Sequence, residues 1–121
     1  MKTHKDLEVW KIAVELAKDV YGVTRSFPRE EQFGLSAQMR RSAVSIASNI
    51  AEGAARQTPK EFVRFLHVAA GSASELDTQI EIATGIGMGE AGEIQRVQDT
   101  VARVARMLQG LIKSVHDKCH D

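Results

Sequence analysis

The sequence has few of the residues that interrupt helices or cross-link chains. It contains one cysteine and two prolines in 121 residues, and aromatic residues make up 5% of it. A single cysteine excludes an intramolecular disulfide, and so few prolines favour long helices. No hydrophobic run approaches the length that crosses a bilayer, and the N-terminus has no apolar segment like a secretory signal. We therefore expect a reduced, cytoplasmic protein with no membrane partner.

The chain also lacks an excess of either charge. Sixteen Lys and Arg residues stand against sixteen Asp and Glu, which gives a formal net charge of zero. No overall field attracts nucleic acid or anionic lipid, so any such binding must come from a local patch. Hydrophobic residues at 43% and charged residues at 26% are close to globular averages. We expect a single domain over residues 1–121 with a core of its own.

Apolar residues recur at spacings of three and four, which predicts helices. Four helices are expected, over residues 7–26, 34–56, 59–84 and 90–117. Asp6 is expected to cap the first helix, and Thr58, Pro59 and Glu61 form a capping signal at the start of the third. Short connections between neighbours predict an all-α protein, an antiparallel up-down-up-down four-helix bundle.

The last helix has the most regular pattern. Its apolar residues alternate at spacings of three and four: Ile94, Val97, Val101, Val104, Leu108, Leu111 and Val115. This alternation is typical of the seam of a bundle. The connection before this helix contains Gly85, Gly87 and Gly89. We interpret it as flexible rather than as a phosphate loop, because no strand precedes it and no Gly-Lys-Ser or Gly-Lys-Thr is present.

A polar line runs beside the apolar face of the second helix. Its members are spaced by three or four residues: Gln38, Arg41, Ser45, Asn49, Glu52 and Arg56. One interpretation is a solvated or intersubunit face with an i,i+4 ion pair between Glu52 and Arg56, and the other is a binding strip. Small residues in the second and third helices would let the two backbones approach closely, and Asn49 would then need a hydrogen-bond partner.

Aromatic residues of the first helix indicate self-association. Trp10, Val14, Ala17 and Tyr21 lie toward the edge of a wide apolar arc. If exposed, they would form a patch of a kind that monomers rarely carry, and an aromatic-centred helix face is typical of an interface core. We therefore expect a homo-oligomer in which this face and the polar line form the subunit contacts.

Candidate groups for catalysis or metal binding are few. His67 has no nucleophile at a suitable spacing, and we expect it to be partly buried and hydrogen-bonded. His116, Cys119 and His120, with His4 at the same end of the bundle, could in principle bind zinc. Their spacing matches no zinc-finger pattern and they lie at the termini, so we interpret them as polar tails. No pair of carboxylates suggests an acid–base dyad, and we expect no metal, no cofactor and no enzymatic activity.

Nucleic-acid binding is an alternative function. The candidate phosphate contacts are Arg40, Arg41 and Arg56 on the second helix and Arg96, Arg103 and Arg106 on the fourth. Binding through these arginines would weaken steeply as the salt concentration increases. Asp99 interrupts the stripe on the fourth helix, so a mixed solvated face is the other interpretation there.

The second and third helices carry a specific sequence pattern. It reads SIASNIAEGAAR over residues 45–56 and KEFVRFLHVAAGSASELDTQIEIA over residues 60–83, and residues 6–44 fit the same pattern. The pattern closely resembles the 23S rRNA intervening sequence proteins, which are four-helix bundles. Its positions here are Asn49, Ala51, Glu52, Gly53, Arg56, Glu61, Phe62, Phe65, Leu66, Ala69, Gly71, Ser72, Glu75 and Leu76. Ala47, where members commonly have proline, and the glycine-rich connection depart from it.

The resemblance implies a bacterial origin, a homo-oligomeric, pentameric assembly, and no known activity. Some relatives are encoded inside insertions of the large-subunit rRNA gene. The family is similar in fold to accessory proteins of diversity-generating retroelements, pentameric barrels that bind nucleic acid and a reverse transcriptase through a strongly basic surface. This chain differs from those accessory proteins, because its net charge is zero and its third helix is acidic. We expect a non-enzymatic homo-oligomeric scaffold, with a nucleic-acid-binding accessory module as the alternative.

Overall fold

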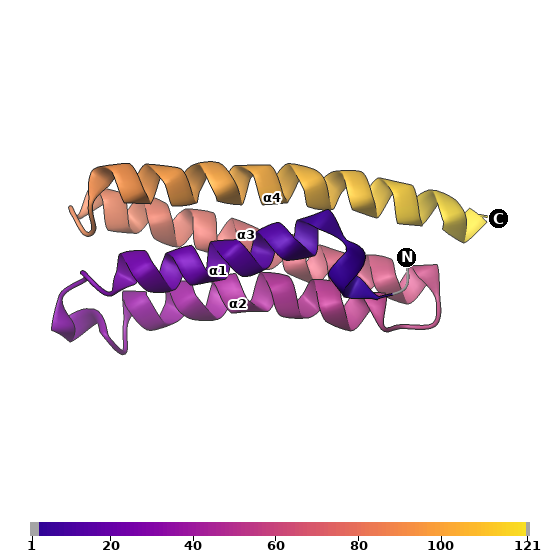
Figure 1. Cartoon of the computed structure of the whole chain (residues 1–121), viewed down its shortest axis with the longest axis horizontal. Helices are drawn as coiled ribbons and strands as arrows, with labels where there is room; N and C mark the ends of the chain where they lie inside the picture. The colour runs from indigo at the N-terminus through magenta and orange to yellow at the C-terminus, as the bar shows by residue number, and fades with distance from the viewer. Residues whose placement is uncertain (1–2, 121) are drawn as a thin grey trace.

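A computed structural model describes residues 3–120 as four long helices packed together (Figure 1). The helices are α1 (Glu8–Thr24), α2 (Leu35–Ala54), α3 (Pro59–Gly85) and α4 (Ala91–Asp117). Three short 3-10 turns accompany them: η1 (His4–Asp6), η2 (Arg29–Glu31) and η3 (Lys118–His120). No strand occurs in the described range, and the predicted all-α class with four helices is confirmed.

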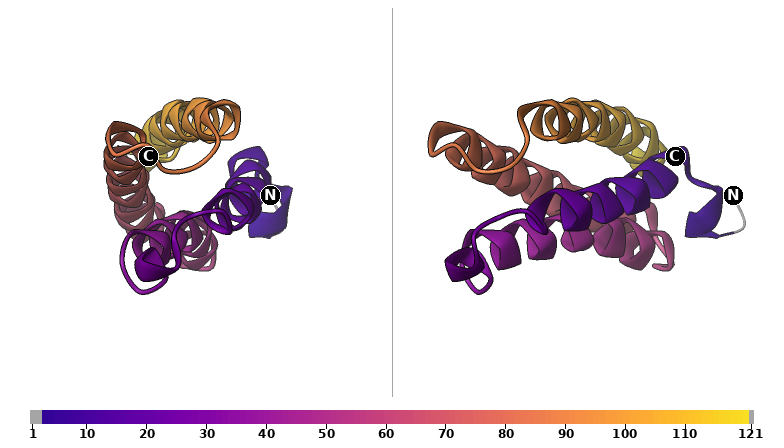
Figure 2. Two further views of the ribbon diagram at one scale, coloured as in Figure 1. Left: turned by 90° about the vertical axis from the view of Figure 1, so that its left-hand side faces the viewer. Right: turned by 60° about the vertical axis from the view of Figure 1, so that its left-hand side comes forward.

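The helices surround a common core when the molecule is viewed end-on (Figure 2). The α1–α2 and α3–α4 connections lie at one end of the molecule, and the α2–α3 connection lies at the other (Figure 1). α2 contacts both α1 and α3, and α4 likewise contacts α3 and α1. Within residues 3–120, none of the helices combines the length and the apolar character that a bilayer crossing requires.

Aliphatic side chains from all four helices fill the core. The largest of those that are fully buried are Leu16, Val20, Met39, Ile46, Ile50, Leu66, Leu76, Ile80, Val97, Val104 and Leu108. The α4 seam follows the prediction at every position but one, including Val115: Ile112 is buried where Leu111 was expected, and Leu111 is only partly buried. A straight helix drifts by roughly 20° per heptad from a strict seven-residue repeat, which moves the buried position forward by one.

A side-chain hydrogen bond caps the start of α3 but not that of α1. Thr58 caps α3: its hydroxyl oxygen accepts from the Glu61 N–H, and Pro59 is the first helical residue, as predicted. The prediction for Asp6 was wrong. Leu7 precedes α1, and the Asp6 carboxylate accepts instead from the Thr3 N–H one turn earlier, where the two residues form a capping box around η1.

Glu90 caps α4. Its carboxylate accepts from the backbone N–H of Gly92 at 2.9 Å and of Glu93 at 2.8 Å. These bonds favour the ionised form, first through Gly92 and then through Glu93, and they lower the pKa of Glu90 below its ordinary value of 4.5. Gly87 and Gly89, in the turn before it, have φ of 75° and 80°, which glycine adopts without strain. A connection between the third and fourth helices is therefore confirmed at Gly87 and Gly89, whereas Gly85 is the last residue of α3.

Candidate functional site

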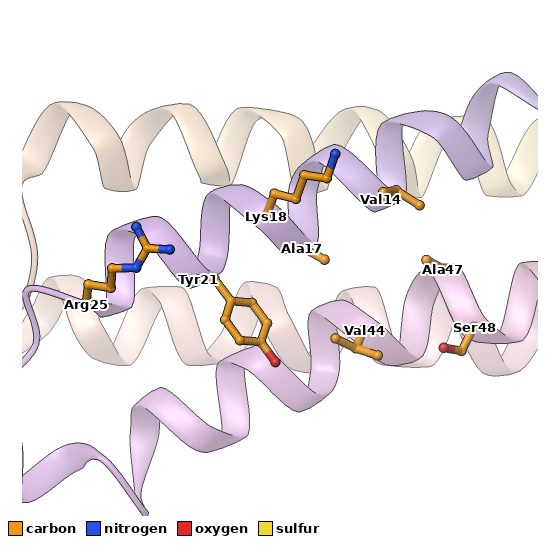
Figure 3. A pocket seen from close by; sticks show the side chains of 8 residues that line it. All are labelled: Val14, Ala17, Lys18, Tyr21, Arg25, Val44, Ala47 and Ser48. Atoms are coloured by element: carbon orange, nitrogen blue, oxygen red, sulfur yellow. The ribbon is translucent and has the colours of Figure 1, made fainter.

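An apolar groove lies between α1 and α2 on the surface of the bundle (Figure 3). It encloses about 440 Å³ and is lined by Val14, Ala17, Lys18, Tyr21, Arg25, Val44, Ala47 and Ser48. Tyr21 is 41% exposed and Val44 is 42% exposed. Both charged members of this α1–α2 groove, Lys18 and Arg25, are basic. The groove therefore offers an apolar centre with positive charge beside it.

Tyr21 is held in place by a side chain from α2. The guanidinium carbon of Arg40 lies 4.7 Å from the centroid of the Tyr21 ring, a cation–π geometry. The Arg40 Nε also donates to the hydroxyl oxygen of Thr24 at 2.8 Å. Thr24 itself is buried and donates back to the Val20 carbonyl oxygen at 2.7 Å. These contacts tie α2 to the C-terminal end of α1 and fix the ring at the groove.

Trp10 lies outside this groove. It is partly buried against the core, and its ring meets the His4 ring edge-on with 4.9 Å between centroids. The structure thus brings together three residues of the face predicted on the first helix, Val14, Ala17 and Tyr21, with Val44 and Ala47 of α2. The fourth, Trp10, packs instead against the core near the N-terminus.

A second surface hollow lies between α2 and α3, and this one is polar. It encloses about 350 Å³ and is lined by Gln38, Arg41, Ser42, Ser45, Ser72, Glu75 and Gln79. Half of the predicted polar line, Gln38, Arg41 and Ser45, contributes to this α2–α3 cleft. The structure therefore gives that part of the line a concave surface rather than a flat solvated face.

Hydrogen bonds organise the floor of the α2–α3 cleft. The Ser45 and Ser72 hydroxyl oxygens lie 2.8 Å apart and join the two helices. The Asn49 Nδ2 donates to the Ser45 carbonyl oxygen at 2.8 Å and to the Ser45 hydroxyl oxygen at 3.0 Å, so Asn49 finds its partner within α2. Gln79 is only 8% exposed, and its Oε1 atom has no hydrogen-bond partner among the residues that the structure describes.

The last part of the polar line lies beyond the cleft. Arg56 and Glu52 form the predicted i,i+4 ion pair. The Arg56 guanidinium carbon also lies 4.7 Å from the centroid of the Phe65 ring, so the side chain crosses from α2 to α3. Glu52 and Arg56 are each already engaged by neighbouring groups of the same subunit.

The six candidate arginines are divided between two helices that do not contact each other. Arg40, Arg41 and Arg56 are on α2, and the other three are on α4. Arg40, which is partly buried, and Arg56, which is exposed, make the intramolecular contacts given above. Arg41, Arg96, Arg103 and Arg106 are also exposed. The structure therefore does not bring the six together on one surface.

The histidines and the cysteine are also dispersed. The prediction for His67 was wrong, because this residue faces away from the buried side of α3 and is exposed. Cys119 and His116 are exposed as well, and the side chain of His120 lies outside the described residues. Among the described residues, no group of three or more His, Cys, Asp or Glu side chains is placed to hold a metal ion.

The α3 wall of the cleft was missed from the sequence. Ser72 and Gln79 are seven residues apart and therefore share one side of the helix, with Glu75 between them. Both lie next to the apolar seam of α3. The spacing of hydrophobic residues does not predict which neighbouring helix such positions contact. The signal that could have identified Ser72 and Gln79 is their spacing of seven residues on α3, the helix that follows the polar line of α2.

Comparison with known proteins identifies the fold. The family model of the 23S rRNA-intervening sequence protein matches residues 5–110. The crystal structure of a protein of unknown function from the S23 ribosomal protein family of Bacteroides thetaiotaomicron VPI-5482 is similar, with a TM-score of 0.78 and 22% identity. The match covers 87% of this chain and 98% of that one. No curated protein matches the sequence.

Proposed function

This chain belongs to the 23S rRNA-intervening sequence protein family, and from that premise we propose that it is a non-enzymatic helical scaffold assembled from several copies of itself. The observation that carries the proposal is the α1–α2 groove. Its apolar centre is open to solvent at Tyr21 and Val44, whereas the other large apolar residues of α1 and α2 are buried or partly buried. Contiguous apolar surface of this kind is typical of a protein–protein contact.

The composition of the α1–α2 groove supports a contact between subunits. An aromatic side chain at the centre of a helix face, flanked by charged residues, is the usual arrangement of an interface core and its rim. Ala17 and Ala47 keep the groove shallow enough for another helix to approach. Lys18 and Arg25 would then meet acidic side chains of the neighbouring subunit.

The proposal extends to the form of the assembly. The subunit is an antiparallel up-down-up-down bundle, which agrees with the alternate ends at which consecutive helices are joined (Figure 1). Five copies form the assembly that the family resemblance implies. We propose a cytoplasmic location for it, where Cys119 would remain a thiol.

Light scattering after size-exclusion chromatography tests the assembly. The chain has a mass of 13.3 kDa, and at micromolar concentration we expect the measured mass to be a multiple of this value. Val44→Glu places a charge in the groove and should shift the mass to that of one chain. Val68→Glu is the matched control, because Val68 is 48% exposed on α3 and does not line the groove.

Three results are informative. Dissociation by Val44→Glu alone, with helical circular dichroism retained, supports the groove as the contact. A wild-type protein with the mass of one chain would overturn the proposed assembly. Equal dissociation by both variants would show that the groove is not the specific contact.

Nucleic-acid binding is a second candidate, supported by the exposure of Arg96, Arg103 and Arg106 on α4. The test is salt-dependent binding of the protein to an RNA hairpin, with scrambled RNA and duplex DNA as competitors. Binding through phosphates would weaken by about one log–log slope unit for each neutralised phosphate. No binding at about 50 mM salt, where such contacts are strong, would exclude this candidate.

A further inference from the structure

The α2–α3 cleft contains a buried polar group that the protein leaves unsatisfied. Gln79 is more than nine-tenths buried, and within residues 3–120 its Oε1 atom accepts no hydrogen bond. Buried carbonyl groups without a donor are rare because the lost hydration is not replaced. Gln79 also lines the cleft, but its Oε1 atom is closed to solvent, so a group that enters the cleft reaches this atom when the terminal amide turns toward the cleft. A ligand whose binding turns this amide would supply the missing donor.

Contacts between α2 and α3 show which residues face each other across the cleft. Gly53 lies against Phe65, and Ser45 is hydrogen-bonded to Ser72, so residues nearer the start of α2 lie beside residues further along α3. Two turns further toward the start of α2 and two turns further along α3, the same pairing places Gln38 beside Gln79. Arg41, one turn from Gln38, accordingly lies at the level of Glu75.

The two walls of the cleft differ in hydrogen-bonding character. On α2, the guanidinium of Arg41 and the amide of Gln38 present N–H donors. On α3, Glu75 and Gln79 are four residues apart and therefore neighbours on the helix surface, so a carboxylate and an amide oxygen can accept from one donor group. The cleft thus offers donors on one side and acceptors on the other.

Arg41 and Glu75 carry opposite charges on the same cleft. Within residues 3–120 they do not form an ion pair with each other, and neither belongs to the pairs found at Glu15–Lys18 and Glu52–Arg56. A cation and an anion that remain apart across a hollow can be bridged by a small molecule with both charges. Such a ligand has no net charge, and the charges of Arg41 and Glu75 in the cleft also cancel.

We propose that the α2–α3 cleft binds a free α-amino acid as its zwitterion. The carboxylate accepts from Arg41 and Gln38, and the ammonium group donates to Glu75 and to the Oε1 atom of Gln79. The hydrogen bond between Ser45 and Ser72 uses one of their two hydroxyl hydrogens, which leaves the other for the ligand carboxylate. The volume of about 350 Å³ is at the small end of ligand sites and suits a small side chain.

Calorimetry and NMR on the full chain test this proposal with the proteinogenic α-amino acids as probes. For at least one of them we expect saturable binding of one molecule per chain, with shifts of the Ser72 and Gln79 amide signals. Propionate and ethylamine each carry one of the two charges of alanine. Both should bind at least about tenfold more weakly than the zwitterion, because each loses one charged hydrogen-bonded contact.

Substitutions locate the site. Glu75→Gln and Gln79→Leu should each weaken binding by about tenfold or more. Asp77→Asn is the matched control, since Asp77 is an exposed carboxylate on the same helix that does not line the cleft. Circular dichroism of each variant distinguishes loss of the site from loss of the fold.

The site is independent of the proposed assembly, because no residue lines both the cleft and the α1–α2 groove. The dissociated Val44→Glu variant should therefore retain binding. The proposal is overturned if no α-amino acid binds, or if Glu75→Gln leaves the affinity unchanged. A third result also overturns it: Glu75→Gln and Gln79→Leu change the oligomeric mass but leave amino-acid binding unaffected. That result would mean that a second copy of the chain, rather than an amino acid, occupies the cleft.

Discussion

Gly53 of α2 and Phe65 of α3 pack so closely that a methyl group on Gly53 would lie 2.8 Å from the Phe65 Cβ atom. It would also lie 3.2 Å from the Phe62 carbonyl oxygen, which belongs to the backbone of α3 and cannot move independently of the helix. Gly53 therefore sets the distance between the two helices. Two turns away, the same close approach brings the Ser45 and Ser72 hydroxyls within hydrogen-bonding distance.

Gly53→Ala should destabilise the protein. The added methyl group forces α3 away from α2, and overpacking of this kind costs about 1–3 kcal/mol. The higher helix propensity of alanine, worth about 1 kcal/mol, offsets only part of this. Urea unfolding followed by circular dichroism, at one fixed protein concentration, measures the difference.

Gly71→Ala is the control for that prediction. Gly71 lies in α3 and a Cβ there would meet nothing within 4 Å, so the substitution should stabilise the protein by about 0.5–1 kcal/mol. Opposite signs for the two variants are expected. The same sign would mean that helix propensity, rather than the contact with Phe65, decides the effect at Gly53.

Gln79→Leu should increase the stability of the protein without ligand. The substitution removes the unpaired Oε1 atom and replaces the amide with an apolar group of similar size. A buried polar group without a partner costs about 1–3 kcal/mol, so a gain of about 1 kcal/mol or more is expected. Thermal and urea unfolding provide the measurement.

Gln109→Leu provides the comparison, because Gln109 is exposed on α4 and the change there should stay within about 0.5 kcal/mol. A destabilised Gln79→Leu variant would show that the amide already has a partner in the protein. A stabilised variant that no longer binds amino acids would show that Gln79 is retained for binding rather than for stability.

The helices could be predicted from the sequence because their signals are local. Thr58 and Pro59 define the start of α3 through a cap and a fixed backbone angle, and the spacing of apolar residues locates the α4 seam. Leu111 and Ile112 were exchanged because a seven-residue repeat ignores the gradual rotation of a straight helix. Asp6 was misassigned because its carboxylate belongs to the capping box that it forms with Thr3 around η1.

The candidate site could be predicted only in part. The α2 wall was visible as the line from Gln38 to Ser45, because these residues repeat at helical spacing on one helix. The α3 wall depends on how α3 is rotated against α2. That rotation is fixed by contacts such as Gly53 with Phe65, which hydrophobic periodicity does not specify. For the same reason the sequence could not show that Trp10 would separate from Tyr21.

Glu90 should contribute a pH-dependent part of the stability. Its pKa is lowered in the folded protein by the N–H groups of Gly92 and Glu93, so the stabilisation is present above the ordinary value of 4.5 and is lost as the pH falls through the folded-state pKa. Glu90→Gln has no carboxylate to protonate. The gap in Tm between wild type and this variant should therefore narrow on acidification, and a gap that stays constant between about pH 3 and 7 would contradict the assignment.

Arg40 should contribute to the stability of the folded protein more than to the binding of nucleic acid. Its Nε atom donates to Thr24 at 2.8 Å, and its guanidinium carbon lies 4.7 Å from the Tyr21 ring, so Arg40→Ala removes a charged hydrogen bond and a cation–π contact. Because the side chain is partly exposed, a loss of about 1–2 kcal/mol is expected in urea unfolding. Arg40→Lys should recover little of it, since an ammonium group lacks the planar, forked donor geometry of a guanidinium.

Arg103→Ala separates this structural role from phosphate contact. Arg103 is exposed on α4, and its removal should change the stability by no more than about 0.5 kcal/mol. If the protein binds RNA through α4, the same variant should reduce the salt slope of binding by about one unit. Arg40→Ala should leave that slope unchanged. A reduced slope in Arg40→Ala with unaltered stability would instead place Arg40 at the phosphate backbone and would contradict its role between α1 and α2.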